Sequence, residues 1–196
     1  MFVVIEGIDG SGKTTVAKKL AEELSKLGRK VYLTYEPTDT KYGKIVKECV
    51  DFGDPFLITL AFALDRALHT HEIRKKISEG YDVICDRYFY STLAYEGAML
   101  SEKMELEEAL NWIEEIHKYI VIKPDYIFLL DVEPHTGLGR IESRKSSSMI
   151  KFFEKERFLE KVRDIYLRIA EKYGMKTIDG SKNVDEIIKE IMKEIL

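Results

Sequence analysis

A short segment near the N-terminus has the residue types and spacing of a phosphate-binding loop: Gly7-Ile8-Asp9-Gly10-Ser11-Gly12-Lys13-Thr14. It fits the pattern G-x-x-x-x-G-K-[ST], in which glycines let backbone N–H groups point at a β-phosphate. The lysine then reaches the β- and γ-phosphates, the hydroxyl of Thr14 ligates Mg²⁺, and the following helix adds its positive N-terminal end. Together with Thr15, this segment predicts an ATP·Mg²⁺ site and phosphoryl-transfer chemistry.

A second group of candidates, Asp86-Arg87-Tyr88, closes an apolar run. A carboxylate at a strand end can hold the water shell of Mg²⁺, and an arginine can bind a phosphate through two parallel N–H donors. The alternative is a strand end with solvated polar residues. The phosphate loop elsewhere in the chain favours the functional interpretation.

The elements that must position these residues alternate along the chain. Near-continuous apolar runs predict strands covered on both faces, at Phe2–Glu6, Val31–Tyr35, Asp82–Asp86, Tyr126–Asp131 and Lys176–Asp179. Helical patterns separate them, at Lys13–Leu27, Pro55–Glu79, Leu106–Ile120, Lys155–Tyr173 and Val184–Ile195. This order predicts an α/β P-loop kinase fold, with a five-stranded parallel sheet and helices on both faces.

The bulk properties narrow the classes of function. A length of 196 residues fits one domain over residues 1–196, and a net charge of −4 argues against a nucleic acid polymer as partner. No apolar stretch approaches the roughly 20 residues of a membrane span, and the N-terminus lacks the features of a signal peptide. We therefore expect a cytoplasmic protein that binds no membrane. Cys49 and Cys85 match no metal-ligand spacing, and Cys85 is expected to be a small buried hydrophobe.

A polar break between two helical patterns, Lys145-Ser146-Ser147-Ser148, is either a plain turn or a lid. Its position relative to the motifs favours a short mobile lid at about residues 140–152.

The chain lacks the Asn-Lys-x-Asp tetrapeptide of a regulatory GTPase. These features favour a nucleoside or nucleotide kinase.

Several further motifs stand in a recognisable order: Glu36-Pro37, Phe62-Ala63-Leu64-Asp65-Arg66, Asp86-Arg87-Tyr88, Ser91 and Ala94-Tyr95-Glu96-Gly97. With the phosphate loop, they resemble the thymidylate kinase family over about the first hundred residues. The C-terminal half agrees more loosely, through Pro124-Asp125, Asp131, Arg140, Arg144 and Asp179-Gly180-Ser181-Lys182.

The resemblance implies transfer of the γ-phosphoryl group of ATP to dTMP, and it implies a homodimer. It implies catalytic roles for Lys13, Arg87 and Arg144, and a Mg²⁺ site at Thr14 and Asp86. For dTMP it implies that Phe62 stacks on thymine and Arg66 donates to its O4. Arg87 would bind the acceptor phosphate, and Tyr88 would lie where a 2′-hydroxyl would go. The other dTMP-binding residues that it implies are Asp9, Glu36, Ser91, Tyr95 and Glu96. For ATP it implies Arg140 on adenine, with Ser181 and Lys182 alongside.

The sequence departs from the family at two points. Some members carry an arginine in the phosphate loop, but residues 8 to 11 here are Ile, Asp, Gly and Ser. Arg144 and Lys145 would then have to supply that charge. The family also usually has glutamine where this chain has Glu96, whose carboxylate accepts the thymine N3–H but repels the base oxygens.

Alternatives stay open at this point. The chain could be a deoxynucleoside kinase with Glu36 as the base, a kinase of another monophosphate, or an ATP-binding switch or scaffold. Arg66 could be a surface side chain beside apolar residues, and Arg140 with Arg144 could form an exposed basic face.

Overall fold

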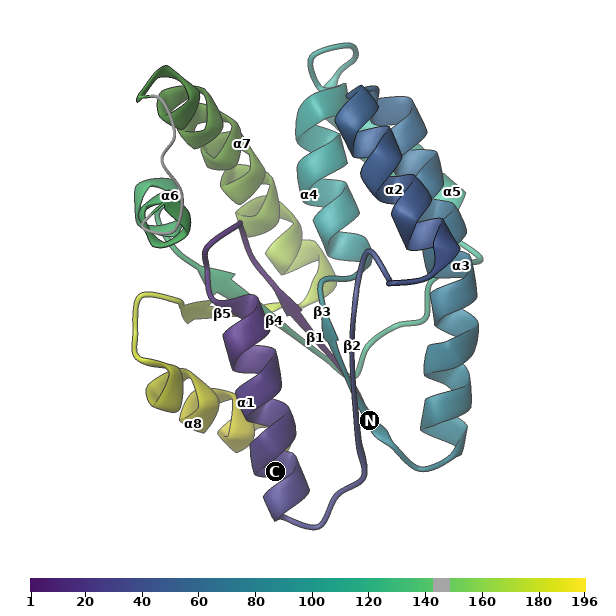
Figure 1. The fold of residues 1–196 in the computed structure, drawn as a ribbon, viewed down its shortest axis with the longest axis vertical. Coiled ribbons are helices and arrows are strands. Elements are labelled where there is room, and N and C mark those ends of the chain that lie inside the picture. The colour runs from purple at the N-terminus through teal and green to yellow at the C-terminus, as the bar shows by residue number, and fades with distance from the viewer. Residues whose placement is uncertain (143–148) are drawn as a thin grey trace.

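The computed structural model describes residues 1–142 and 149–196 (Figure 1). Its strands are β1 (Phe2–Glu6), β2 (Val31–Tyr35), β3 (Asp82–Asp86), β4 (Tyr126–Asp131) and β5 (Lys176–Asp179). Its helices are α1 (Lys13–Lys26), α2 (Lys41–Phe52), α3 (Pro55–Ser78), α4 (Phe89–Leu100), α5 (Leu106–His117), α6 (Pro134–Glu142), α7 (Met149–Tyr173) and α8 (Val184–Ile195). No helix within these ranges is long and apolar enough to cross a membrane.

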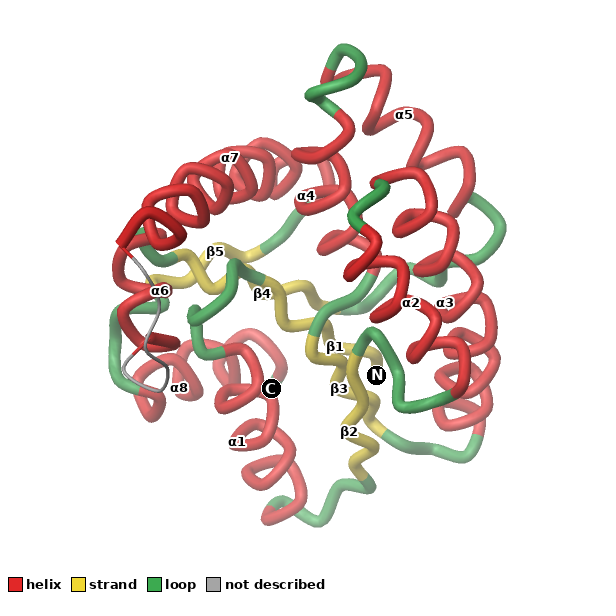
Figure 2. The backbone as a smooth tube through the Cα atoms, turned by 45° about the horizontal axis from the view of Figure 1, so that its top comes forward, coloured by secondary structure: helices red, strands yellow, loops and turns green. Residues whose placement is uncertain are grey.

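The strands form one parallel sheet in the order β2-β3-β1-β4-β5, which confirms the predicted fold class. Side chains alternate between the faces of each strand. Val3 and Ile5 face a core built with α1 and α8, whereas Phe2 and Val4 face the larger core, which contains residues of α3, α4, α5 and α7. Helices therefore cover both faces of the sheet (Figures 1 and 2).

The predicted strand bounds are all confirmed, but burial on both faces holds only for the three central strands. β2 and β5 lie at the sheet edges, where most of their side chains are partly or fully exposed. Leu33 and Tyr35 of β2 are 37% and 43% exposed, respectively. Cys85, in contrast, is fully buried, as expected.

The helix predictions were incomplete. α1, α3 and α5 end within one turn of their predicted ends, while α7 begins earlier than predicted, at Met149. α2 and α4 were not predicted, and for α6 only a helical pattern before Lys145 was expected, without bounds. Ten of the residues of α4 are buried, so its sequence carries no polar stripe that would mark an amphipathic helix.

The parallel arrangement brings every strand's carboxyl end to one edge of the sheet. The phosphate loop follows β1, Glu36 follows β2, Asp86 ends β3, and Gly180 follows β5. This edge is where the candidate residues meet.

Candidate active site

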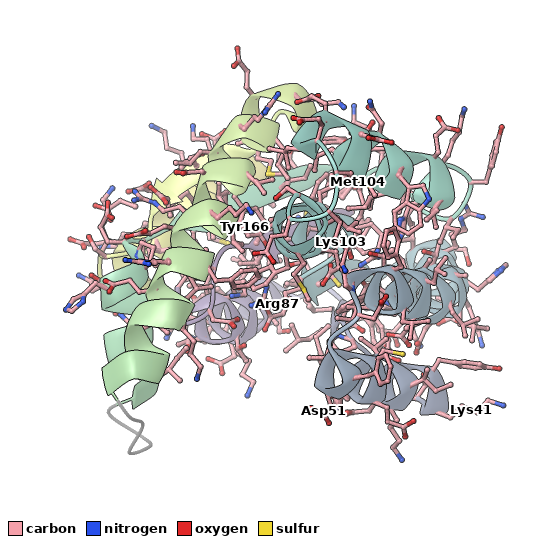
Figure 3. The ribbon with its side chains drawn as sticks, turned by 90° about the horizontal axis from the view of Figure 1, so that it is seen from above. Lys41, Asp51, Arg87, Lys103, Met104 and Tyr166 are labelled. Carbon is pink, nitrogen blue, oxygen red and sulfur yellow. The ribbon has the colours of Figure 1, made fainter. Side chains whose placement is uncertain are left out.

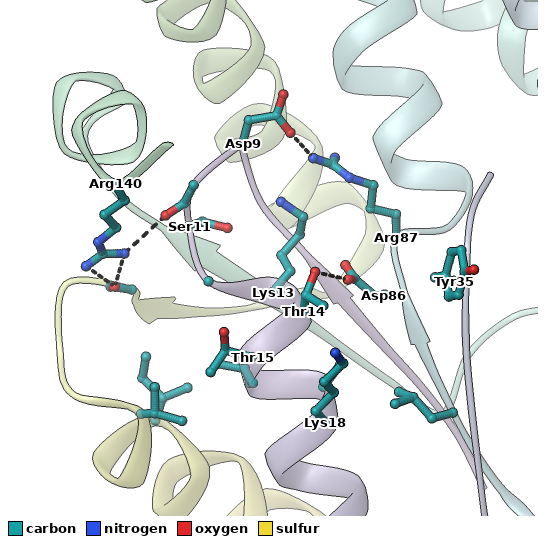
Figure 4. Close-up of a pocket in the computed structure, with 18 of the residues that line it drawn as sticks. Asp9, Ser11, Lys13, Thr14, Thr15, Lys18, Tyr35, Asp86, Arg87 and Arg140 are labelled. Carbon is teal, nitrogen blue, oxygen red and sulfur yellow. Dashed lines mark hydrogen bonds and ion pairs between the residues drawn. The ribbon is translucent and has the colours of Figure 1, made fainter. Parts of the chain in front are cut away.

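The phosphate loop wraps around the side chain of Lys13. Lys13 is only 6% exposed, and its Nζ donates to the backbone oxygen of Ile8 at 2.7 Å. Burial, and to a lesser degree the nearby Arg87, lower the pKa of Lys13 to about 7, although Asp9 and Asp86 oppose the shift. The ammonium group is therefore held inside the loop, where a phosphate is expected (Figure 4).

The start of α6 packs directly on this loop. A Cβ added at Gly10 would lie 2.0 Å from the backbone oxygen of Gly137, and one added at Gly137 would lie 2.5 Å from the backbone oxygen of Asp9. The paired glycines thus allow a backbone approach that side chains would prevent. Arg140 of α6 donates to the backbone oxygens of Gly10 and Gly180, each at 3.2 Å, and so joins the loop to the end of β5 (Figure 4).

Two oxygen-bearing side chains meet beside the loop. The Thr14 hydroxyl donates to Asp86 Oδ2 at 2.5 Å, while Asp86 Oδ1 is buried without a hydrogen-bond partner in the described part of the chain. A hydroxyl and a carboxylate oxygen suit Mg²⁺, which takes few protein ligands and binds phosphates and water as well. Within the described ranges, no group of three or more His, Cys, Asp or Glu residues could hold a metal. A metal at this site would therefore take most of its ligands from phosphates and water.

A cavity of about 1180 Å³ opens over the loop. The loop and the start of α1 line it from Asp9 to Lys18, and the end of β2 with the residue after it lines it from Leu33 to Glu36. Arg140 and Lys182 line it as well. Among the predicted ATP-binding residues, Gly7, Ile8 and Ser181 do not line it. The hydroxyl of Ser181 instead donates to Asp179 at 2.6 Å, which shapes the loop after β5.

Arg87 directly follows β3 and points back toward the phosphate loop (Figure 4). Its guanidinium forms an ion pair with Asp9 and donates to Ser91 Oγ at 3.1 Å and to the Tyr95 hydroxyl at 3.4 Å. Its backbone has a φ of 70°, in the left-handed region that side chains disfavour. Figure 3 shows Arg87 near the centre of the molecule, whereas Lys41 and Asp51 of α2 lie at its edge.

Glu6, at the end of β1, is a site residue that the sequence analysis missed. It is fully buried, and it accepts hydrogen bonds from the backbone N–H groups of Tyr88 and Ser91 and from the hydroxyls of Ser91 and Tyr166. The start of α4 has no side-chain cap of its own, so Glu6 supplies one from another element. Burial raises the pKa of Glu6, and these hydrogen bonds and Arg87 oppose that shift. A charged residue ending an apolar strand was the only signal in the sequence.

A second cavity, of about 360 Å³, lies between α3, α4 and α7. The residues that line it include every predicted dTMP-binding residue: Asp9, Glu36, Phe62, Arg66, Arg87, Tyr88, Ser91, Tyr95 and Glu96. Asp9, Glu36 and Arg87 also line the first cavity. The two cavities therefore share one cation, Arg87, and two carboxylates, Asp9 and Glu36.

Arg66 is 1% exposed, which rules out the alternative of a surface side chain. It contacts Glu36 Oε2 at 2.6 Å, His117 Nε2 at 2.7 Å and Thr92 Oγ1 at 3.0 Å. Because an arginine only donates, His117 Nε2 must accept, so Nδ1 carries the proton that is donated to the Ile113 oxygen. Burial and the nearby Arg66 lower the pKa of His117 to about 3, so it stays neutral. His117 had no signal in the sequence.

Tyr88 is one of the residues that line the second cavity, and it is only 1% exposed. The hydroxyl accepts from the backbone N–H of Ile122 at 3.1 Å and lies 3.3 Å from Thr70 Oγ1. These two contacts fix the hydroxyl end of the ring. Arg144, Lys145 and the centre of the expected lid lie outside the described residues.

A phosphate loop at the carboxyl edge of a parallel sheet, with a large cavity that joins a second cavity at an arginine, defines a P-loop phosphotransferase. The family model described as thymidylate kinase matches residues 5–191. The chain belongs to the thymidylate kinase family.

Proteins similar to this chain support the same assignment. A probable thymidylate kinase of Methanocaldococcus jannaschii is 39% identical over 98% of this chain and 94% of its own length. A probable thymidylate kinase of Thermococcus kodakarensis is 41% identical over 98% of this chain and 95% of its own length. The thymidylate kinase of Coprothermobacter proteolyticus is 38% identical over 100% and 98%, respectively.

Proposed function

We propose that this protein transfers the γ-phosphoryl group of ATP to the 5′-phosphate of dTMP, forming dTDP and ADP. Its family and the names of its relatives support this activity. The observation that carries the proposal is the pair of cavities sharing Asp9, Glu36 and Arg87. A nucleotide on the phosphate loop and an acceptor in the second cavity would bring their phosphates together at Arg87.

The residues of this site act by positioning and by charge. The acceptor oxygen belongs to a phosphate that is already ionised, so the transfer requires no general base. Lys13 would bind the β- and γ-phosphates of ATP, and Arg87 would bind the acceptor phosphate through its planar fork. Arg144 would add a further cation from the lid.

Phosphoryl transfer in this family depends on ATP and generally needs a divalent metal, and we infer that Mg²⁺ serves here. Thr14 and Asp86 would hold it, since the unpartnered Asp86 Oδ1 offers a hard oxygen ligand. When bound, Mg²⁺ would neutralise part of the negative charge of the phosphates.

The acceptor site follows from the lining of the second cavity. Phe62 would stack on thymine, Arg66 would donate to O4, and the fixed ring of Tyr88 would exclude a 2′-hydroxyl. Ser91, Tyr95 and Glu96 complete this lining. Adenine would lie at the other end of the first cavity, against Arg140 and Lys182, with Ser181 supporting the loop.

A deoxynucleoside kinase is the nearest rival, and the surroundings of Glu36 disfavour it. Its two carboxylate oxygens contact Arg66 and His69, at 2.6 and 3.0 Å, respectively. Burial would raise the pKa of Glu36, but Arg66 and His69 outweigh burial and lower it. A carboxylate held in this way is a poor base for a neutral hydroxyl.

A homodimer would explain the outer face of α3. Four leucines at helical spacing, Leu57, Leu60, Leu64 and Leu68, are each 44–49% exposed. A second copy of the chain would bury this stripe. Light scattering should report a dimer for the natural chain and a monomer for Leu64→Glu.

Three further expectations stay predictions: a single domain, a lid at about residues 140–152 and a cytoplasmic location.

The activity is tested by ADP formation from ATP·Mg²⁺ with dTMP, dUMP, UMP, dCMP, dGMP, dAMP and thymidine as acceptors. We expect a clear preference for dTMP, and a loss of several orders of magnitude for Lys13→Ala with the fold retained. Preference for thymidine would favour the deoxynucleoside kinase. Activity with none of these acceptors would contradict the proposal.

A further inference from the structure

The second cavity contains an acidic side chain in the middle of α4. Glu96 is 5% exposed and lines the cavity together with Phe62 and Arg66. Since Phe62 is the aromatic side chain expected to stack on the base, Glu96 lines the same cavity in which the base would lie. Its protonation state therefore matters for what the cavity can bind.

The nearby arginines are engaged with other groups. Arg66 contacts Glu36, His117 and Thr92, and Arg87 contacts Asp9 and Ser91. No ion pair within 4.0 Å reaches Glu96 from any residue that the structure describes. An ionised carboxylate buried without a paired cation is costly, and such groups take up a proton instead.

The other charged groups around the cavity largely compensate one another. Arg66 of α3 faces Glu36, which follows β2, and Arg87, which follows β3, faces Asp9 of the phosphate loop. Among the residues that the structure describes, the other groups around the cavity are uncharged: Tyr88 and Tyr95 near Glu96 in the chain, Phe158 of α7, and neutral His117 of α5. Burial raises the pKa of Glu96 to about 8, and Arg66, Arg87 and the Thr92 hydroxyl oppose this shift without cancelling it.

We propose that Glu96 recognises the base as a neutral carboxylic acid, which donates its O–H to a ring carbonyl oxygen and accepts the adjacent imide N–H. This inference rests on the proposed function. Thymine presents an N–H between two carbonyl oxygens, so a group with one donor beside one acceptor matches it. An ionised carboxylate has two acceptors, one of which would face a carbonyl oxygen and repel it. Glu96 thus does what a neutral amide would do, but only while it keeps its proton.

The test compares natural enzyme with Glu96→Gln, an uncharged group of the same shape. We would measure kcat/KM for dTMP from about pH 6.5 to 9.5 at constant ionic strength. The ratio of natural enzyme to Glu96→Gln should fall about tenfold between about pH 7 and pH 9, mainly through KM. Titration of the substrate and of other groups affects both proteins equally, so this ratio isolates Glu96.

Two further measurements separate a base contact from a merely structural role. The infrared difference spectrum between natural enzyme and Glu96→Gln should show the band of a protonated carboxyl at neutral pH, and that band should disappear above about pH 9. Glu96→Ala should raise KM for dTMP at neutral pH, where the natural side chain keeps its proton, and this increase should shrink above about pH 9.

A constant ratio across the pH range, or an unchanged KM in Glu96→Ala, would overturn the inference. Absence of dTMP phosphorylation by the natural enzyme at neutral pH would instead overturn the proposed function. The infrared measurement tests the protonation of Glu96 in either case.

Discussion

The guanidinium of Arg87 forms an ion pair with the Asp9 carboxylate, and both side chains line both cavities. This contact joins the phosphate loop after β1 to the end of β3. It places the cation at the junction before any phosphate arrives, so little reorganisation is needed when one binds. To place its side chain there, the backbone of Arg87 adopts a φ of 70°.

The strained backbone of Arg87 gives a prediction about stability. Arg87→Gly and Arg87→Ala both remove the guanidinium, but only glycine adopts a positive φ without steric cost. Urea unfolding should therefore show Arg87→Gly to be more stable than Arg87→Ala by about 1 kcal/mol. Both variants should lose most of their activity with dTMP. Equal unfolding free energies for the two variants would contradict the inference that the backbone of Arg87 is strained.

The contact between α6 and the phosphate loop should be sensitive to a single methyl group. In Gly137→Ala the new Cβ would lie 2.5 Å from the backbone oxygen of Asp9, so the loop must shift. We expect kcat/KM for both substrates to fall about tenfold or more. Gly139→Ala is the matched control, because no described atom lies within 4 Å of its Cβ. Gly139→Ala should keep its activity, and its unfolding free energy should rise by about 0.5–1 kcal/mol. Similar behaviour of the two variants would be inconsistent with this contact.

Glu6 should act as a positioning residue. In Glu6→Gln the amide nitrogen cannot accept from the hydroxyls of Ser91 and Tyr166, which lie 2.6 and 2.9 Å from Glu6 Oε2. We expect a loss of about 2–3 kcal/mol in unfolding free energy. KM for dTMP should also rise, because Ser91 contacts Arg87.

The control for Glu6 is Glu107→Gln. Glu107 is 62% exposed and pairs with Arg168 at the surface, so its loss should cost under about 0.5 kcal/mol. A neutral effect of Glu6→Gln on both stability and KM would show that Glu6 does not organise the start of α4.

The raised pKa of Glu96 predicts how stability depends on pH. The pKa is about 8 in the folded protein against 4.5 for the free group, so the folded state binds the proton more tightly. The resulting stabilisation is fully present below about pH 4.5 and is lost as the pH rises through 8. The unfolding free energy of the natural chain, relative to Glu96→Gln, should therefore fall by up to about 5 kcal/mol across this range. Urea titrations at several pH values measure it, and a flat difference would contradict a buried neutral Glu96.

Much of the fold could be predicted from the sequence, because the patterns that indicate its strands and the phosphate loop each lie within one short segment. Continuous apolar runs predicted all five strands, and the phosphate loop between the first strand and a helix predicted the nucleotide edge. The exposed sides of β2 and β5 were not predicted, because strand order is not encoded in any one strand. α4 was missed since a helix buried all round lacks the polar face that marks its period.

The site residues that were missed depend on contacts between distant segments. Glu6 accepts hydrogen bonds from residues about 80 to 160 positions away, and His117 accepts from Arg66 across two helices. Gly137 matters only because Gly10 lies against it. Nothing in the neighbouring sequence of these residues distinguishes them from ordinary structural positions. The residues found by motif, in contrast, lie together at one edge of the sheet.

The most direct test of the function is to incubate the natural enzyme with ATP, Mg²⁺ and dTMP and to quantify dTDP and ADP by anion-exchange chromatography. The predicted result is equal amounts of the two products, with none formed by Lys13→Ala. Formation of ADP without dTDP would contradict phosphoryl transfer to dTMP at the junction of the two cavities.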